Sequence, residues 1–522
     1  MLPEIVGMDI FVVFIVILAF TYYVLFLSRK AKNGVPPEWP FVGMLPSLFI
    51  HFNDLYDTIS RILIECGGTF IVKGLPQPTV LTSDPTNVEY ILTTKFSSFP
   101  KGPGFRSAFT DLFGDGLFNV DGEPWIQQRK ASVVQLNSVS SLTYVLKSVQ
   151  ESLLQNLIPI LDNTVSTGSA MDLQDIFFRF TFDNICKFAF GVEMGCLSPS
   201  LPAIPFVKAF DDAVEASCSR FTTPISFRKI MRCLGLGIDA KLQSALKTID
   251  QFVMEIVSSR REELGIAKNR MSDSRADLLS IFMKSPDKNG VPYSDTFLRG
   301  ICLSFILAGS DTTSVALSWF FWLLLQHSHV EENILKEIHR ILKDRPAHVK
   351  PGDPVCFSRE ELKEMHYLHA CLSETMRLYP PVPLGRKEAI EDEVLPDGTP
   401  MKKGTAIMYV TYAMGRMESI WGSDCMEFKP KRWLNDEGAF VNQSVYRYPV
   451  FHGGPRMCLG RDFAYLQMKH IAASILYRYK LRLVNEGEEV KYKVGGLTLF
   501  MKNGLPVTVQ SRVTEQSRYY SV

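Results

Sequence analysis

The sequence predicts a mainly α-helical fold with small β-sheets, an α+β fold. Over long stretches, apolar residues recur at the spacing that places them on one face of a helix. These stretches are 143–161, 172–190, 241–264, 294–326, 360–379 and the segment from about Cys458 to Tyr479. Short β-branched runs within 66–92 and 480–510 predict small sheets. Residues 193–240 are rich in Pro, Ser and Cys and indicate no particular element.

The chain is expected to form one large unit. Apolar periodic segments follow one another from Trp39 to Val509 without a long polar gap, so a single unit is simpler than the roughly three domains that length alone suggests. The predicted divisions are a membrane anchor with a basic flank over 1–33, a proline-rich hinge over 34–45, a main domain over 46–510 and a polar tail over 511–522.

The N-terminus carries a membrane signal. Residues 10–27 contain no charge and approach the ~20 residues that span a bilayer. Arg29, Lys30 and Lys32 follow, which places the body on the cytoplasmic side by the positive-inside rule. A single-pass signal-anchor in the endoplasmic reticulum membrane is the preferred interpretation, since the basic start and cleavage site of a removable signal are missing. A buried core helix is the alternative.

Composition excludes several classes of protein. The formal net charge is +1, so no basic excess favours nucleic acid as a partner. The 10 cysteines form neither a CxxC motif nor a Cys/His zinc pattern. This argues against a disulfide framework and favours a reducing compartment.

One cysteine has neighbours that favour a chemical role. In the segment FHGGPRMCLG, which begins at Phe451, two glycines and a proline predict a tight turn. Arg456 lies two residues before Cys458, where the helical pattern begins, and a cation and a helix N-terminus both favour a thiolate. Gly460 leaves room for a flat ligand. Together these features predict the axial thiolate ligand of a haem iron, and a buried, inert cysteine is the alternative.

A second segment places polar groups inside a long apolar stretch. Residues 308–313 read AGSDTT, and acids or hydroxyls in such surroundings are costly unless they have partners. One interpretation is a core helix with back-bonded threonines. The other is a helix that crosses the distal face of a haem, distorted near Ala308 and Gly309 to admit O2. Asp311 and Thr312 would then deliver the protons that cleavage of dioxygen requires.

These residues resemble a known family. The pattern F-x-x-G-x-R-x-C-x-G, formed by Phe451, Gly454, Arg456, Cys458 and Gly460, is similar at every position to the haem-binding signature of cytochrome P-450 enzymes. The resemblance implies the cytochrome P-450 fold, with haem b buried between the distal helix and the cysteine loop and its helix. It also implies that Cys458 is the metal ligand, that Arg456 pairs with a haem propionate and that Phe451 packs near the sulfur.

Further motifs of that family occur in the expected order. Trp125 and Arg129 share a helix face, and they resemble the pair that donates to a haem propionate. Arg386, after PPVPLG, is another candidate propionate partner, with a surface arginine as the alternative. Gln135 and Leu136 stand where many relatives have an acidic and an aromatic residue, so the packing at that helix end is left open.

A buried ion network is also expected. Glu374 and Arg377 lie three residues apart on one helix face, a pattern that alone is usually a solvated surface pair. Arg432, in FKPKRW, matches the family arginine that joins this pair. The resemblance therefore implies a structural network of the three residues.

Longer strings resemble the plant fatty-acid ω-hydroxylase clan. They are WPFVGMLPSL, FPKGPGFRSAFTDLFGDGLFNVDGEPW, MDLQDIFFRFTFDNIC and AGSDTTSVALSWFFWLL. The resemblance implies NADPH- and O2-dependent hydroxylation of long-chain fatty acids at or near the ω carbon, of the kind used for cutin, suberin or sporopollenin. NADPH–cytochrome P-450 reductase is the expected electron donor, with cytochrome b5 as a second candidate. The segments expected to line the substrate pocket are 104–120, 205–213, 301–308, 382–384 and 497–500.

Three alternatives remain open at this point. The first is a hydroxylase of the same family that acts on mid-chain alkane, a terpenoid or a sterol. The second is an NADPH-independent enzyme that rearranges fatty hydroperoxides, although such relatives lack the pair that Asp311 and Thr312 form here. The third is a membrane-tethered haem carrier, which leaves that same pair unexplained.

Overall fold

The computed structural model describes most of the main domain. The described residues are 17–18, 21–22, 43–73, 77–136, 139–223, 228, 237–267, 277–285, 290–343, 345, 353–485 and 487–512. Most of the predicted anchor and hinge, and nearly all of the predicted tail, lie outside these residues. Within the described residues, Asp295–Gln326 is the one helical stretch long and apolar enough to cross a membrane, but 83% of its apolar window is buried inside the protein.

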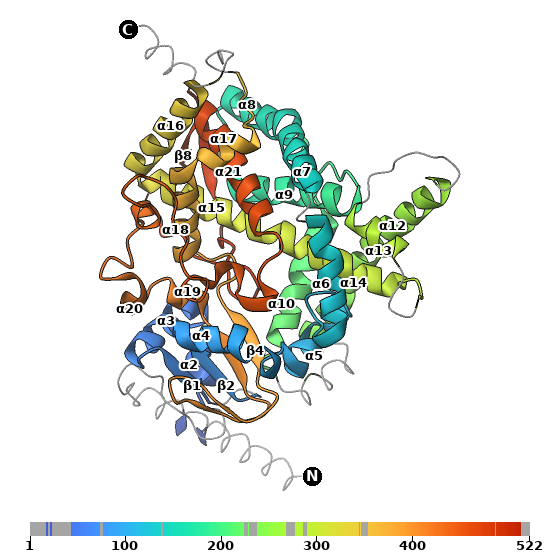
Figure 1. Cartoon of the computed structure of the whole chain (residues 1–522), viewed down its shortest axis with the longest axis vertical. Coiled ribbons are helices and arrows are strands. Elements are labelled where there is room, and N and C mark those ends of the chain that lie inside the picture. Colours follow the sequence, from blue (N-terminus) through green and yellow to red (C-terminus); the bar gives the residue numbers. More distant parts are fainter. Residues whose placement is uncertain are drawn as a thin grey trace, which may run out of the picture.

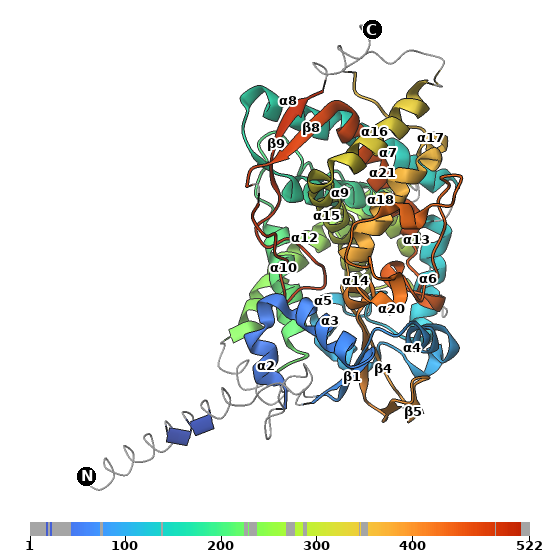
Figure 2. The same cartoon turned by 90° about the vertical axis from the view of Figure 1, so that its left-hand side faces the viewer.

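That stretch forms the centre of the fold (Figures 1 and 2). It consists of α14 (Asp295–Gly309) and α15 (Asp311–Gln326), and α9 (Leu173–Phe190) packs against both. On α15 lie α18 (His366–Leu378) and α21 (Arg461–Arg478). Because α14 and α15 are buried on nearly all sides, they are apolar around their whole circumference and not only along one stripe.

The other predicted helices are present with shifted ends. The stretches 143–161 and 241–264 correspond to α7 (Val139–Ser152) with α8 (Ile158–Thr167) and to α12 (Gly237–Ala267). The stretch 360–379 is two helices, α17 (Arg359–Glu364) and α18, because a capping box formed by Ser358 and Glu361 starts α17 and the chain breaks at Met365. The unassigned region 193–240 contains α10 (Pro205–Ser219).

Three small sheets complete the fold, so the predicted α+β class is confirmed. The largest has the strand order β1 (Thr69–Val72), β2 (Thr79–Thr82), β7 (Ala406–Tyr409) and β4 (Gly385–Glu388). In it β2 and β7 run parallel, with Thr79 opposite Ala406, and the other pairs are antiparallel. The others are β3 (Met171–Asp172), β9 (Pro506–Ser511) and β8 (Tyr479–Leu483), and β5 (Glu393–Val394) with β6 (Pro400–Met401).

Shorter helices surround this frame. They are α2 (Leu45–Ile50), α3 (Leu55–Glu65), α4 (Pro85–Glu89), α5 (Gly102–Phe113), α6 (Gly122–Leu136), α13 (Leu278–Lys284), α16 (Ser328–Lys343), α19 (Thr411–Met414) and α20 (Glu418–Trp421). Helix α5 contacts α10, α14 and β4, which joins the large sheet to the central helices. The sequence pattern had not singled out α5 as a helix.

Candidate active site

The cysteine loop connects two short turns to α21. Phe451 ends one 3-10 turn, Gly454 begins the next, and the N–H of Cys458 donates to the carbonyl of Phe451 over 2.8 Å. Helix α21 begins only at Arg461, so Cys458 lies before the helix and not at its first residue as predicted. The loop holds the thiol just ahead of the helix N-terminus.

Gly454 is required by its surroundings. Its φ of +60° lies in the left-handed region that L side chains rarely adopt. A Cβ atom at this position would collide with the backbone carbonyl of Leu92. The glycine of the signature therefore lets the loop pack closely against the chain at Leu92.

The Cys458 side chain is accessible and yet deep inside the protein. Of the nine described cysteines, all unpaired, Cys458 is the exposed one. Burial nevertheless raises the pKa of its thiol, while the N–H of Gly460 and the charges of Arg129 and Arg461 act in the opposite direction. The lowered thiol pKa expected from the sequence is thus not found, because burial outweighs the nearby charges. A sulfur that is accessible at such depth faces a hollow within the protein.

The structure brings three predicted haem-contacting residues together beside this loop. The guanidinium of Arg456 lies 4.4 Å from the centre of the Trp125 ring, and that of Arg129 lies 5.7 Å from it. Arg129 also donates to the carbonyl of Met457 over 2.7 Å, which ties α6 directly to the cysteine loop. Trp125, Arg129 and Arg456 therefore form one group, as their predicted shared role requires.

Two lysines that the sequence analysis missed join this group. Lys101 and Lys387 lie close enough to Arg456 for the like charges to lower the lysine pKa values, and Asp121 is the carboxylate that opposes them. Burial is the larger cause, and it brings the pKa of Lys387 to about 7. We call Lys101, Lys387, Arg456 and Asp121 the cationic cluster. Only the strand register of β4 could have singled out Lys387, which is 1% exposed.

The cationic cluster has more positive charge than its own carboxylate neutralises. Asp121 pairs with Arg456 over 2.6 Å and accepts from the backbone N–H of Lys101. Among the described residues, the Nζ of Lys387 and the Nε of Arg456 are buried without a hydrogen-bond partner. Buried ammonium and guanidinium groups require a counter-charge.

Arg386 lies in different surroundings from Lys387. Because successive strand residues point to opposite faces, the Arg386 side chain contacts Gln77 and the ring of Phe221, with 4.7 Å to the ring centre. Lys387 is the residue of β4 that belongs to the cationic cluster. Both residues have buried nitrogens without a hydrogen-bond partner among the described residues, namely the Nε and Nη1 of Arg386 and the Nζ of Lys387. Because Lys387 lies beside Arg456, and Arg386 beside Phe221, we expect Lys387 to be the propionate partner on this strand.

The distal segment has the predicted distortion. Helix α14 ends at Gly309 and α15 begins at Asp311, and the carbonyl of Ser310 accepts from the Thr181 hydroxyl on α9 over 3.0 Å. A Cβ at Gly309 would collide with the Ile185 side chain. Gly309 therefore permits close packing of α9, a reason that the sequence did not reveal.

One face of this buried helix is accessible. Between residues 300 and 321, Ala308, Gly309 and Thr312 are partly accessible and the others are buried. The Thr312 hydroxyl donates to the carbonyl of Ala308 over 2.7 Å, so this threonine is back-bonded. It is also partly accessible, so the back-bond and an accessible hydroxyl occur together. Ala308 and Thr312 are four residues apart and therefore share one face, whereas the adjacent Gly309 faces Ile185 of α9. Ala308 and Thr312 line open space inside the core.

Asp311 points elsewhere. Its carboxyl is buried, 3.1 Å from the Ser310 hydroxyl and 3.5 Å from that of Thr498. Burial raises the pKa of Asp311 to about 8, and the charge of Asp211 adds to this effect. The hydroxyls and Lys493 act in the opposite direction. At neutral pH this carboxyl therefore carries a proton.

The predicted ion network is present, with Glu374 and Arg377 fully buried and Arg432 partly exposed. Glu374 accepts from Arg377 over 2.7 and 2.8 Å and from Arg432 over 2.8 Å. The indole N–H of Trp433 and the backbone N–H of Lys429 donate to the same carboxylate, each over 2.9 Å. The network joins α18 to the loop that leads to the cysteine turn.

The site residues fit a haem. A flat dianionic group with two propionates would supply the counter-charge that the cationic cluster lacks, and the hollow at Cys458 gives its iron an accessible sulfur. Lys387, Arg456, Trp125 and Arg129 would hold the propionate edge. The fold and site therefore define a haem-thiolate protein.

The comparisons with known proteins agree. A model of the family "Cytochrome P450" matches residues 34–507. Cytochrome P450 86B1 of Arabidopsis thaliana is 46% identical over 522 residues, covering 98% of this chain and 92% of that protein. Cytochrome P450 94A2 of Vicia sativa is 39% identical over 511 residues, covering 94% and 96%. The chain belongs to the cytochrome P450 family, and the family prediction is confirmed.

Lys387→Met is expected to weaken haem retention, because it removes a buried cation that a propionate would neutralise. A charge-assisted hydrogen bond contributes about 1.5–3 kcal/mol, so haem transfer to excess apomyoglobin should accelerate by about tenfold or more. Arg386→Met is the matched control on the same strand and should change the transfer rate less. Equal effects of both variants would contradict the assignment of Lys387 to the propionate edge.

Proposed function

We propose that this cytochrome P450 is an NADPH- and O2-dependent haem-thiolate monooxygenase that hydroxylates long-chain fatty acids at or near the ω carbon. The observation that carries the proposal is the accessible thiol of Cys458 within the core, together with the accessible face of Ala308 and Thr312. When bound, the haem supplies the iron that activates dioxygen for insertion into a C–H bond. The protein supplies protons, orientation and an apolar site.

The segments predicted to line the substrate pocket converge in the fold. The N–H of Leu499 donates to the carbonyl of Pro381 over 2.9 Å, which places 497–500 beside 382–384. The indole of Trp319 donates to the carbonyl of Leu499 over 2.7 Å and ties this pair to α15. Segments distant in the sequence thus meet at the central helices.

Aromatic side chains dominate the other predicted pocket segments. On α5, Phe105, Phe109 and Phe113 form a continuous row, with ring centres 4.8 and 5.5 Å apart. Phe113 also meets Phe210 of α10 at 6.5 Å. An apolar, aromatic surrounding favours a long hydrocarbon chain over a polar substrate. This composition supports a lipid substrate and leaves sterols and terpenoids as alternatives.

Asp311 and Thr312 are proposed to deliver protons. Asp311 holds a proton on its carboxyl, since its pKa is raised to about 8, and the Thr312 hydroxyl lies on the accessible helix face. Asp211 and Lys493, which form a half-exposed ion pair over 3.4 Å, act on the charge of Asp311 from the protein surface. A hydroperoxide-rearranging enzyme needs no such proton supply, which disfavours that alternative.

Asp311→Asn is expected to lower NADPH-dependent turnover by about a hundredfold or more, because it removes a positioned proton donor. Wild-type turnover should fall as the pH rises through about 8, where Asp311 loses its proton, and the variant should lack this step. Burial raises the pKa of Asp311 in the folded state above its value in the unfolded chain. The contribution of the protonated Asp311 to the free energy of unfolding is therefore complete below about pH 4 and is lost as the pH rises to about 8. Asp436→Asn, at an exposed position, is the control.

The variant should keep the carbon monoxide difference spectrum of the wild type. Turnover and the urea midpoint, each measured against pH, check both parts of the prediction. A variant with the wild-type pH profile would show that Asp311 is not the proton donor.

The test of the proposed substrate is direct. Microsomes that contain the protein are incubated with reductase, NADPH and C16–C18 fatty acids, and hydroxylated products are identified by mass spectrometry. We expect hydroxy acids with the oxygen at or near the ω carbon, formed only with NADPH. Absence of any hydroxy acid, with turnover of a sterol or terpenoid instead, would favour the alternative substrates. NADPH-independent consumption of fatty hydroperoxides would favour the rearranging enzyme.

The proposed setting follows from the same reasoning. Residues 1–33 are proposed to anchor the protein in the endoplasmic reticulum membrane, with 34–45 as a stiff hinge and 46–510 as the cytoplasmic catalytic domain. Fatty acids partition into bilayers, so a membrane-bound enzyme meets its substrate there. NADPH–cytochrome P-450 reductase is the proposed electron donor, with cytochrome b5 as a second one.

A further inference from the structure

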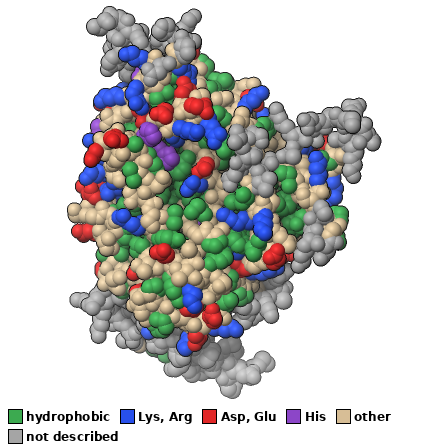
Figure 3. All heavy atoms as spheres, viewed as in Figure 1, with side chains coloured by type: hydrophobic (Ala, Val, Ile, Leu, Met, Phe, Trp, Pro, Cys, Tyr) green, Lys and Arg blue, Asp and Glu red, His purple; other side chains and the backbone are tan. Residues whose placement is uncertain are grey.

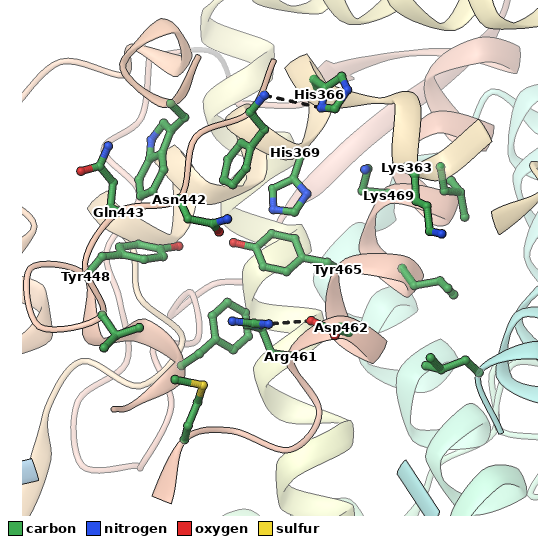
Figure 4. Close-up of a pocket in the computed structure, with 18 of the residues that line it drawn as sticks. Lys363, His366, His369, Asn442, Gln443, Tyr448, Arg461, Asp462, Tyr465 and Lys469 are labelled. Carbon is green, nitrogen blue, oxygen red and sulfur yellow. Dashed lines mark hydrogen bonds and ion pairs between the residues drawn. The ribbon is translucent and has the colours of Figure 1, made fainter. Parts of the chain in front are cut away.

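A separate pocket lies beside the cysteine loop. It has a volume of about 420 Å³ and is bounded by α17, α18, the chain from Trp433 to His452 and the start of α21 (Figure 4). Met457 and Phe451 form its boundary toward the Cys458 turn. None of the motifs identified in the sequence accounts for a pocket here.

The lining of this pocket is strongly cationic. Its basic and histidine side chains are Arg359, Lys363, His366, His369, His452, Arg461 and Lys469. The one carboxylate in the lining, Asp462, pairs with Arg461 over 3.0 Å. Figure 3 shows histidine and basic side chains together on this face of the molecule, where α17 and α18 lie in Figure 1. The pocket thus has an excess of positive charge.

Lys469 is the most informative of these residues. It is 5% exposed and lines the pocket, but no hydrogen bond or ion pair joins its ammonium to another described residue. Burial lowers the pKa of Lys469 to about 8, and the charges of Glu337 and Glu364 act in the opposite direction. Glu337 already accepts the N–H groups of Tyr367 and Leu368 over 2.8 and 2.9 Å. The nitrogen of this ammonium is accessible from the pocket, since it is not one of the fully buried polar atoms that lack a hydrogen-bond partner among the described residues. A cation that opens into a pocket without a close partner attracts an anion there, and the pocket has room for one.

Aromatic rings give this pocket a stiff wall. His369 stacks on Tyr465 with 4.0 Å between ring centres, and Phe440 lies 4.0 Å from the other side of His369. Burial lowers the pKa of His369 to about 3, so its ring is neutral at pH 7. Figure 4 shows Lys469 between His369 and Lys363, and Asn442 on the opposite side. Cations, amides and rings together suit a small organic anion.

We propose that this pocket binds a small organic anion that carries carboxylate or phosphate groups, with the ammonium of Lys469 as its buried counter-charge. Lys363 and Arg461 are the exposed cations at its rim, and Arg359 is partly exposed. The site is separate from the haem hollow and independent of the fatty-acid proposal. Because Met457 and Phe451 belong to both the pocket and the cysteine turn, a bound anion would lie beside the ligand loop.

Calorimetry on the haem-loaded protein tests the proposal, with citrate as the carboxylate probe and inorganic phosphate as the other. We expect one site that binds at least one of the two anions. The anion that binds more tightly shows whether the natural ligand carries carboxylate or phosphate groups. Lys469→Gln should weaken binding by about tenfold or more, because it removes a charge-assisted hydrogen bond. Lys402→Gln, at an exposed position directly after β6 and outside the pocket lining, is the control and should bind as the wild type does.

Lys363→Gln provides a second variant on an exposed position, where folding is not at risk. It should weaken binding by a smaller factor than Lys469→Gln. The proposal is overturned if neither anion binds to the wild type, or if both pocket variants bind as tightly as Lys402→Gln. The measurement requires neither electron donor nor fatty acid, so its failure leaves the proposed hydroxylase activity untouched.

Discussion

Cys458→Ala is expected to abolish the strongly red-shifted Soret band of the reduced carbon monoxide complex and all NADPH-dependent oxidation. The reason is that a thiolate donates electron density to the iron and no other described cysteine is placed to replace it. The other eight described cysteines are buried or only partly accessible, and among the described cysteines Cys458 alone is exposed. The reduced carbon monoxide difference spectrum of purified protein measures the effect directly.

Cys66→Ala is the matched control, because Cys66 is a free, partly accessible cysteine at the end of α3, outside the site. It should keep the band and the activity. If the wild type lacks the red-shifted band, or if Cys458→Ala keeps it, the haem-thiolate assignment is wrong.

Glu374→Gln is expected to have the second largest effect, a loss of most folded, haem-containing protein. The substitution leaves the fully buried Arg377 and the largely buried Arg432 without the carboxylate that both contact. Breaking one partner of a buried ion network costs about 3–5 kcal/mol. Since whole domains are stable by about 5–15 kcal/mol, this loss is a large share of the total.

The urea midpoint and the haem content per protein measure this effect. Glu437→Gln is the control, because Glu437 is exposed and has no ion pair among the described residues. This control should change the free energy of unfolding by less than about 0.5 kcal/mol. A wild-type midpoint for Glu374→Gln would show that the network contributes little to stability.

The local motifs were readable from the sequence because their chemistry depends on short spacings. Trp125 and Arg129 share a helix face at any position in a fold, and the turn before Cys458 needs its glycine for a local reason. The long apolar stretches likewise predicted the central helices, because burial on all sides leaves a composition that neighbouring residues reveal.

Other features depended on contacts between distant segments. The sequence offered Arg386 as a candidate propionate partner, with a surface arginine as the alternative, but gave no sign that Lys387 of the same strand lies beside Arg456 and Asp121. The sequence also did not reveal how deeply Cys458 lies in the fold. Local charges predicted that the pKa of its thiol is lowered, but burial by distant residues raises that pKa. Lys469 gave no signal at all, because its isolation arises from the helices packed around it.

The sequence by itself determined the class of this protein: the predicted ligand cysteine, the acid and hydroxyl of the long apolar helix and the Glu374 network are encoded in short patterns. Only the tertiary structure decided which cations surround the haem edge, which way Asp311 points and that a cationic pocket lies behind the cysteine turn. The physical reason is that residue type and spacing set local geometry. Burial and charge balance depend on all the residues around a side chain, and only the folded chain brings these residues together.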